Sequence, residues 1–274
     1  MTYHVGRQGV LRLVLSGGRK TTITEQFVQP PYHIQRAIHC DDTIYDMAHL
    51  YMMSSSGGIL GKDNHTIQIT LKGKARARLT TQGATRIYDT QGMVATQSIS
   101  ITLEQDSYLE FLPDITIPYR NSRYVQSVDI VCHPSATIIY TDILSSGRRA
   151  FGEMFEYSSF KSTVSAKSDT DTWRLYDASQ IEPTQNSISK YGIMGTYDIV
   201  STIYILAPAS IIPKVYSDIN DTMLHHKDVS CGASITHSKD GIIVRMLANK
   251  TEAILHMMYS VVRVVRHHAV SPVV

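Results

Sequence analysis

Charged residues are scarce in this sequence of 274 residues: they make up 18% of the chain, and the formal net charge is only +2. The basic excess that favours nucleic acid or an anionic membrane is therefore missing, and we expect neither partner. No apolar run approaches the roughly 18 residues that span a bilayer, and no basic segment leads into an apolar one at the N-terminus. These absences predict a cytoplasmic protein.

Cysteine is also scarce. Cys40, Cys132 and Cys231 form no CxxC pair and no zinc-ligand spacing, so we interpret them as small apolar residues in a reducing compartment. Histidine is in mild excess, but His225-His226 and His267-His268 lack the H-x3-H and H-E-x-x-H spacings of metal sites. We predict no tightly bound metal and no cofactor, and only a transient contact with a soft divalent ion is left open.

The motifs of phosphate binding and of serine catalysis are absent as well. Gly57 and Gly61 enclose three residues where a phosphate-binding loop has four, and Asp63 stands where that loop needs a hydroxyl. No serine lies in a G-x-S-x-G turn. A cysteine–histidine pair remains open, because its members can be distant in sequence. The chain is predicted not to be an enzyme.

Short strands dominate what is present. Apolar and polar residues alternate over 67–72, 75–80 and 98–103, as in half-buried strands. The segments 69–81, 101–113 and 129–141 share one plan, a strand, a polar turn of about four residues and a second strand. In this repeat Leu71, Leu103 and Val131 correspond, as do Leu79, Phe111 and Ile139. Stacked β-coils fit the repeat, and a β-meander in a sandwich is the alternative.

The end of the chain changes period. Its apolar residues recur at helical spacing, which predicts an amphipathic helix over 249–268 with Asn249 or Thr251 as its cap. The stripe comprises Ile254, Met257, Met258, Val261 and Val265. We therefore expect one domain over 1–274, mainly β over 8–248, with few helices.

Three carboxylates interrupt otherwise apolar segments. Glu110, Asp142 and Glu153 would each need a cation, an arginine or water if they point inward. Outward-facing carboxylates, or pairs with Arg148 or Arg149, are the simpler interpretation for each one. An internal polar passage is the alternative.

Four segments, in order, resemble the urease accessory family UreD, also called UreH. Residues 54–63 (SSSGGILGKD) are similar to its glycine loop, and 79–88 (LTTQGATRIY) to its Thr-Thr-Gln signature. Residues 109–117 (LEFLPDITI) and 146–155 (SGRRAFGEMF) are similar to two further motifs. The sequence departs from the family at Lys62, where a second glycine is usual before Asp63, and at Phe111, where tryptophan is usual.

The resemblance implies a β-helical scaffold that performs no chemistry of its own. Such proteins bind the accessory protein UreF, through it the GTPase UreG, and apo-urease, so that nickel reaches the urease centre. It further implies an internal nickel path, and our hypothesis is that Thr81, Gln82, Glu110, Asp142 and Glu153 line or support it. The family-motif loop residues are Gly57, Gly58, Gly61, Asp63 and Arg148, and the apolar stripe of the C-terminal helix is expected to face UreF. A β-solenoid hydrolase or isomerase, or an interaction module without a urease role, is the alternative.

Overall fold

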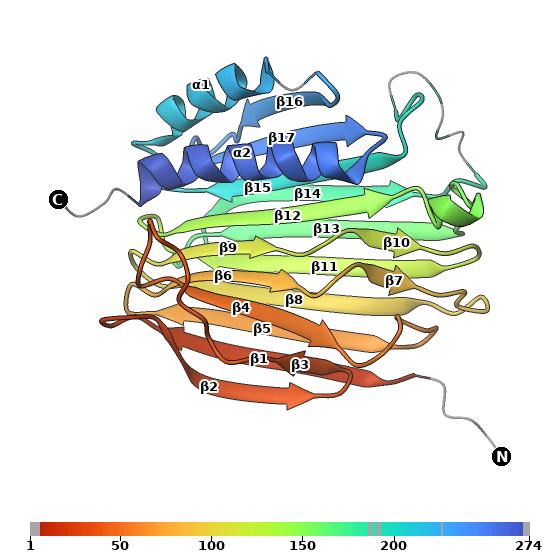
Figure 1. Cartoon of the computed structure of the whole chain (residues 1–274), viewed down its shortest axis with the longest axis horizontal. Coiled ribbons are helices and arrows are strands. Elements are labelled where there is room, and N and C mark those ends of the chain that lie inside the picture. Colours follow the sequence, from red (N-terminus) through yellow and green to blue (C-terminus); the bar gives the residue numbers. More distant parts are fainter. Residues whose placement is uncertain (1–5, 186–187, 189, 191–192, 226, 271–274) are drawn as a thin grey trace.

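The chain winds back and forth between two stacked sheets, as the computed structural model shows for residues 6–185, 188, 190, 193–225 and 227–270. One seven-stranded sheet, called sheet A, has the strand order β14-β13-β11-β8-β5-β1-β2. The other, sheet B, has the order β16-β17-β15-β12-β9-β6-β4-β3, with β7 and β10 beside it. Figure 1 looks onto sheet B, with sheet A behind it.

The strands of sheet A are β1 (Gln8–Ser16), β2 (Thr22–Gln29), β5 (Asn64–Lys72), β8 (Ala95–Leu103), β11 (Arg123–Cys132), β13 (Ser159–Lys167) and β14 (Trp173–Ile181). Those of sheet B are β3 (Tyr32–Ile34), β4 (Ala48–Ser54), β6 (Arg76–Thr81), β7 (Thr85–Ile87), β9 (Tyr108–Leu112), β10 (Thr116–Pro118), β12 (Thr137–Ser145), β15 (Ile199–Leu206), β16 (Ser230–Ile235) and β17 (Gly241–Ala248). The helices are η1 (Arg149–Phe151), α1 (Ile212–Met223) and α2 (Thr251–Ala269).

Parallel pairing of successive coils confirms the predicted stacked β-coil fold. β5, β8, β11 and β13 pair in parallel in sheet A, and β4, β6, β9 and β12 pair in parallel in sheet B. Four-residue turns over 72–75, 104–107 and 133–136 carry the chain from sheet A to sheet B, and each is closed by a backbone hydrogen bond of 2.8–3.2 Å. These are the polar turns of the repeat.

The register of the third repeat differs from the prediction by one residue. Leu71 pairs with Leu103 and Leu79 with Phe111, as expected, but Leu103 pairs with Cys132 and Phe111 with Tyr140. Val131 is consequently exposed on sheet A, and Ile139 is buried on the far side of sheet B. A shift of one residue moves a side chain to the other face of a strand, so the predicted correspondence at Val131 and Ile139 was wrong.

Two apolar layers hold these elements together. The first fills the space between the sheets with inward residues such as Leu71, Leu103 and Phe111. The second lies between sheet B and the two helices, which cover the C-terminal strands of this sheet (Figure 1). Neither α1 nor α2 combines the length and the apolar character that a crossing of a membrane requires. Sheet B is thus covered on both sides at β12, whereas on β17 the face opposite the helices carries the exposed Arg245.

Candidate functional site: a polar seam between the sheets

A row of polar side chains interrupts the apolar layer between the sheets. His65, Gln97, Gln126 and Ser162 are direct register partners on β5, β8, β11 and β13. Each lies two residues before a core residue that faces inward. Because residues two apart on a strand share a face, all four side chains point toward sheet B. We call this row, together with the facing residues Tyr32, Tyr140 and Asp142 of sheet B, the polar seam.

At the N-terminal end of the polar seam, hydrogen bonds join His65, Tyr32, Gln97 and Tyr124. Gln97 Nε2 donates to the Tyr32 hydroxyl over 2.9 Å, and the Tyr124 hydroxyl donates to Gln97 Oε1 over 3.0 Å. The Tyr32 hydroxyl also shares a hydrogen bond of 3.1 Å with His65 Nδ1. Burial lowers the pKa of His65, so its ring is neutral near pH 7. Its Nε2 is buried and has no hydrogen-bond partner in the described part of the chain.

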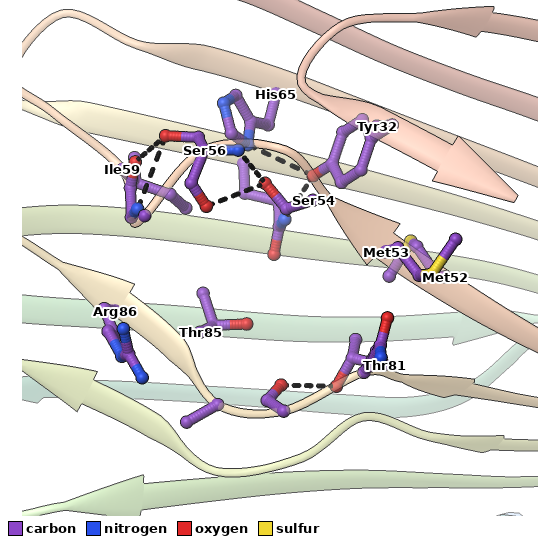
Figure 2. A pocket seen from close by; sticks show the side chains of 16 residues that line it. Tyr32, Met52, Met53, Ser54, Ser56, Ile59, His65, Thr81, Thr85 and Arg86 are labelled. Atoms are coloured by element: carbon purple, nitrogen blue, oxygen red, sulfur yellow. Dashed lines mark hydrogen bonds between the residues drawn. The ribbon is translucent and has the colours of Figure 1, made fainter.

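A pocket of about 260 Å³ opens onto this end of the seam. Tyr32, His65 and Gln97 line it together with Thr81, Gln82, Gly57 and Gly58. Figure 2 shows Thr81 across the pocket from His65 and Tyr32. Four predicted residues, two from the glycine loop and two from the end of β6, are thus brought together.

In the middle of the seam, Gln126 connects the two sheets. Its Nε2 lies 3.2 Å from the Tyr140 hydroxyl, 3.3 Å from Asp142 Oδ2 and 3.4 Å from Ser162 Oγ. Ser162 also donates to Asp142 Oδ2 over 3.0 Å. Burial raises the pKa of the Asp142 carboxyl, and the Ser162 hydrogen bond opposes this rise. Asp142 is therefore a half-buried carboxylate whose hydrogen bonds, among the described residues, come from neutral donors.

A second pocket, of about 170 Å³, reaches Asp142 from the C-terminal side. It is lined also by Asp177, Thr202, Tyr204 and Arg245. The Tyr204 hydroxyl donates to Asp177 Oδ2 over 2.9 Å, and Arg245 Nη2 lies 2.9 Å from both oxygens of the same carboxylate. The polar seam thus runs between two pockets, and carboxylates lie at its C-terminal end.

The groups along the seam are poorly suited to hold a metal ion tightly. Neutral oxygens and nitrogens can replace part of a hydration shell, and the interior carboxylate favours positive charge. Among the described residues no group of three or more His, Cys, Asp or Glu side chains is placed to bind a metal ion. Of the histidine pairs, His268 bonds to Asp218 over 2.7 Å, and His226 lies outside the described residues.

The remaining loop residues of the family motif shape the backbone. Asp63 Oδ1 and Oδ2 accept hydrogen bonds from the amides of Arg7 and Leu60, each over 2.8 Å. A side chain at Gly61 would bring its Cβ within 2.4 Å of the Thr90 carbonyl oxygen. Lys62 has a φ of 67°, a conformation that favours glycine. The lysine that replaces the usual second glycine of the family motif therefore stands at a strained position.

Glu110 does not lie on the polar seam. It is fully buried on the opposite face of sheet B, beneath α2. It accepts from Arg78 Nε over 2.6 Å, from the Tyr108 hydroxyl over 2.7 Å and from Arg266 of α2. Arg266 also reaches Asp41 Oδ2, 2.8 Å away. Glu110 thus fixes α2 to the sheet. It is paired with arginine, but its partners are Arg78 and Arg266 and not the predicted Arg148 or Arg149.

Glu153 is likewise paired with an arginine. Arg148 Nε donates to its Oε2 over 2.8 Å, and a second guanidinium nitrogen contacts Oε1. The Arg148 guanidinium also lies 4.3 Å from the centre of the Tyr119 ring. The Arg148 hydrogen bonds lower the pKa of Glu153. The two residues hold the loop around η1.

The five predicted path residues therefore lie in separate places. Thr81 and Gln82 line the pocket at one end of the polar seam, Asp142 belongs to the seam itself, and Glu110 and Glu153 lie elsewhere.

The predicted C-terminal helix is present as α2, but its apolar stripe is not a free surface. The stripe is buried against sheet B and α1, with 2% exposure or less at every position: Ile254, Met257, Met258, Val261 and Val265. The expectation that these side chains face UreF needs correction, because the second apolar layer already covers them. Only the opposite face of α2 is accessible to a partner.

The sequence interpretation missed the residues that build the seam. His65, Gln97 and Gln126 each take the inward phase of an alternating strand, two residues before Ile67, Ile99 and Val128. The sequence could have revealed them, because a polar residue stands at a core-facing position of three successive strands.

Cys132 lies in the core, where burial raises its thiol pKa to about 11, and this disfavours a thiolate nucleophile.

Comparison with known proteins agrees with this architecture. The profile of the family described as UreD urease accessory protein matches residues 7–273. The urease accessory protein UreD of Cenarchaeum symbiosum is 32% identical over 250 residues, which cover 91% of this chain and 88% of that protein. UreD 2 of Brucella canis is 30% identical over 88% of this chain and 81% of its own length, and UreD of Photorhabdus laumondii is 30% identical over 90% and 78%. The chain belongs to the UreD urease accessory protein family.

Proposed function

We propose that the chain is a non-catalytic scaffold for urease maturation. It binds a UreF-type accessory protein, through it a UreG-type GTPase, and apo-urease, and it passes nickel ions as cargo along the polar seam. The observation that carries the proposal is the row of polar side chains, hydrogen-bonded in two groups around Gln97 and Gln126, that lies between the pocket at Thr81 and the pocket at Asp142. Family membership supports the urease role.

The composition of the seam fits transit better than storage. Buried polar groups stabilise a core less than apolar ones do, so a whole row of them suggests a function other than stability. Imidazole nitrogen and oxygen donors suit Ni²⁺, whereas a cage of three or four charged ligands would retain it. Asp142 supplies negative charge, and Gln126 and Ser162 supply groups that can rotate from Asp142 toward a passing ion or water.

The test is activation of apo-urease by nickel and bicarbonate with UreF- and UreG-type proteins, with and without this chain. We expect activation to require the chain. Asp142→Asn should slow it about tenfold, which corresponds to about 1.4 kcal/mol in a rate barrier, while co-purification with the partners persists. Nickel content of the urease, measured alongside its activity, separates delivery from later steps.

Asp129→Asn is the matched control, because Asp129 lies exposed on the outer face of sheet A and bonds to Ser165. It should activate urease like the unaltered chain. Equal activation without the chain would contradict the scaffold. Full activation by Asp142→Asn would contradict the seam as the path and leave the scaffold standing.

A further inference from the structure

A groove lies on the outer side of sheet B, between β6 and the accessible face of α2. Its volume is about 580 Å³, and its polar lining comes mainly from Arg78, His225, His256, Tyr259, Arg263 and Arg266. We call it the basic groove. No aspartate or glutamate is among its lining residues. It is separate from the polar seam, because sheet B lies between them.

The three arginines of the basic groove differ in how their charge is compensated. Arg266 and Arg78 pair with Glu110 and Asp41, which lie beneath the groove. Arg263 donates to Ser260 Oγ over 3.1 Å and forms no salt bridge within the described part of the chain. Its exposed guanidinium therefore leaves one uncompensated positive charge in the groove, with His225 and His256 beside it.

Arg78 also has free hydrogen-bonding capacity toward the groove. Glu110 holds its Nε, and the described residues provide no hydrogen bond to its two terminal nitrogens. Its guanidinium carbon lies 5.7 Å from the centre of the Tyr259 ring. A guanidinium that is already oriented loses little entropy when it binds a carboxylate, and two parallel hydrogen bonds make that pair specific.

Exposed aromatic rings lie on the same face of sheet B as these charges, and one of them, Tyr259, contacts Arg78. Tyr259 is 45% exposed, and Tyr51 is 43% exposed on the same face of sheet B, opposite Thr80 in the register. Tyrosine and arginine are the residue types that contribute most to protein–protein binding. A small anion would use the guanidinium groups alone, whereas a polypeptide would use both the guanidinium groups and the rings.

We infer that the basic groove docks an acidic segment of a protein partner, whose carboxylates pair with Arg78 and Arg263 and whose apolar side chains contact Tyr259. The inference rests on the proposed function and names the chemistry of one contact in it, that with the UreF-type accessory protein. The buried stripe of α2 holds the helix in place, and its exposed face presents Tyr259 and Arg263.

The experiment measures the Kd of the UreF-type protein for the full chain and its variants by titration calorimetry. Arg263→Glu should weaken binding at least tenfold, because it replaces an attraction by a repulsion. Arg263→Lys should retain most of the affinity. Binding of the unaltered chain should fall more steeply with added NaCl than binding of Arg263→Glu. A glutamate-to-lysine change in the docked segment should restore binding to Arg263→Glu.

Lys161→Glu is the control of equal charge change, since Lys161 lies on the outward face of β13 in sheet A. It should bind within twofold of the unaltered chain. If Lys161→Glu weakens binding as much as Arg263→Glu does, net charge is responsible and the groove assignment is overturned. Unchanged binding by Arg263→Glu overturns it too, while no binding by the unaltered chain overturns the proposed partner and the groove together.

Discussion

Gln126 and Asp142 lie on different sheets, and the Nε2 of one is 3.3 Å from the Oδ2 of the other. The bond crosses the layer that apolar side chains fill elsewhere along the coils. In the described part of the chain the donors to Asp142 are an amide and a hydroxyl, so no side-chain cation there lies within hydrogen-bond distance of its charge. The protonation state of Asp142 therefore depends on pH and on any cation that enters the seam.

The raised pKa of Asp142 predicts a specific pH dependence of stability. Its pKa lies above the ordinary value of 3.8 in the folded chain, so the folded state binds more protons than the unfolded state above this pH. Stability should therefore fall as pH rises from 3.8 to the folded pKa, and should then stay level. The measurement is the free energy of unfolding in urea at several pH values, for the unaltered chain and for Asp142→Asn.

The difference between the two proteins isolates this group, because other carboxylates, such as Glu153, have lowered pKa values and act in the opposite direction. As pH rises from 3.8 to the folded pKa of Asp142, Asp142→Asn should become more stable relative to the unaltered chain. A difference that does not vary with pH would show that Asp142 titrates alike in the folded and unfolded chain.

The ion pairs of Glu110 predict a large effect of removing its charge. Glu110→Gln should destabilise the chain by about 3–5 kcal/mol, because it removes the charge of a fully buried carboxylate and leaves the partly buried guanidinium groups of Arg78 and Arg266 without a full partner. Thermal or urea unfolding measures it. Glu156→Gln is the control, since Glu156 forms an exposed pair with Arg120, and such pairs contribute about 0–1 kcal/mol. Equal losses for both variants would contradict the role of Glu110 in fixing α2.

Most of the fold was predictable because each coil is built from local patterns. Alternation gave the strands of 67–72 and 98–103, and helical spacing gave α2, whose bounds differ from the prediction by no more than two residues. The register of the third repeat was not predictable, because three imperfect copies allow a shift at Cys132. Only the backbone hydrogen bonds between coils decide it.

The candidate site was less predictable than the fold. The pairing of strands within one sheet follows from the repeat, so the sequence could in principle predict that His65 and Gln97 face the core. Which residues face them across the core depends on how two sheets stack, and no local pattern encodes that. Glu110 shows the reverse case, because its neighbours in sequence are apolar on both sides and cannot reveal which layer it enters.

The backbone at Lys62 offers a stabilising substitution. Lys62 has a φ of 67°, and a residue with a Cβ is strained there by about 1–2 kcal/mol relative to glycine. Lys62→Gly should therefore raise the free energy of unfolding by roughly 0.5–1 kcal/mol, after the greater entropy of glycine in the unfolded chain is counted. Lys62→Ala removes the same side chain but keeps the Cβ, so it should leave stability nearly unchanged. Urea unfolding of the three proteins distinguishes the two effects. Equal stability of the glycine and alanine variants would mean that the lysine side chain, and not the backbone conformation, determines the energy of this loop.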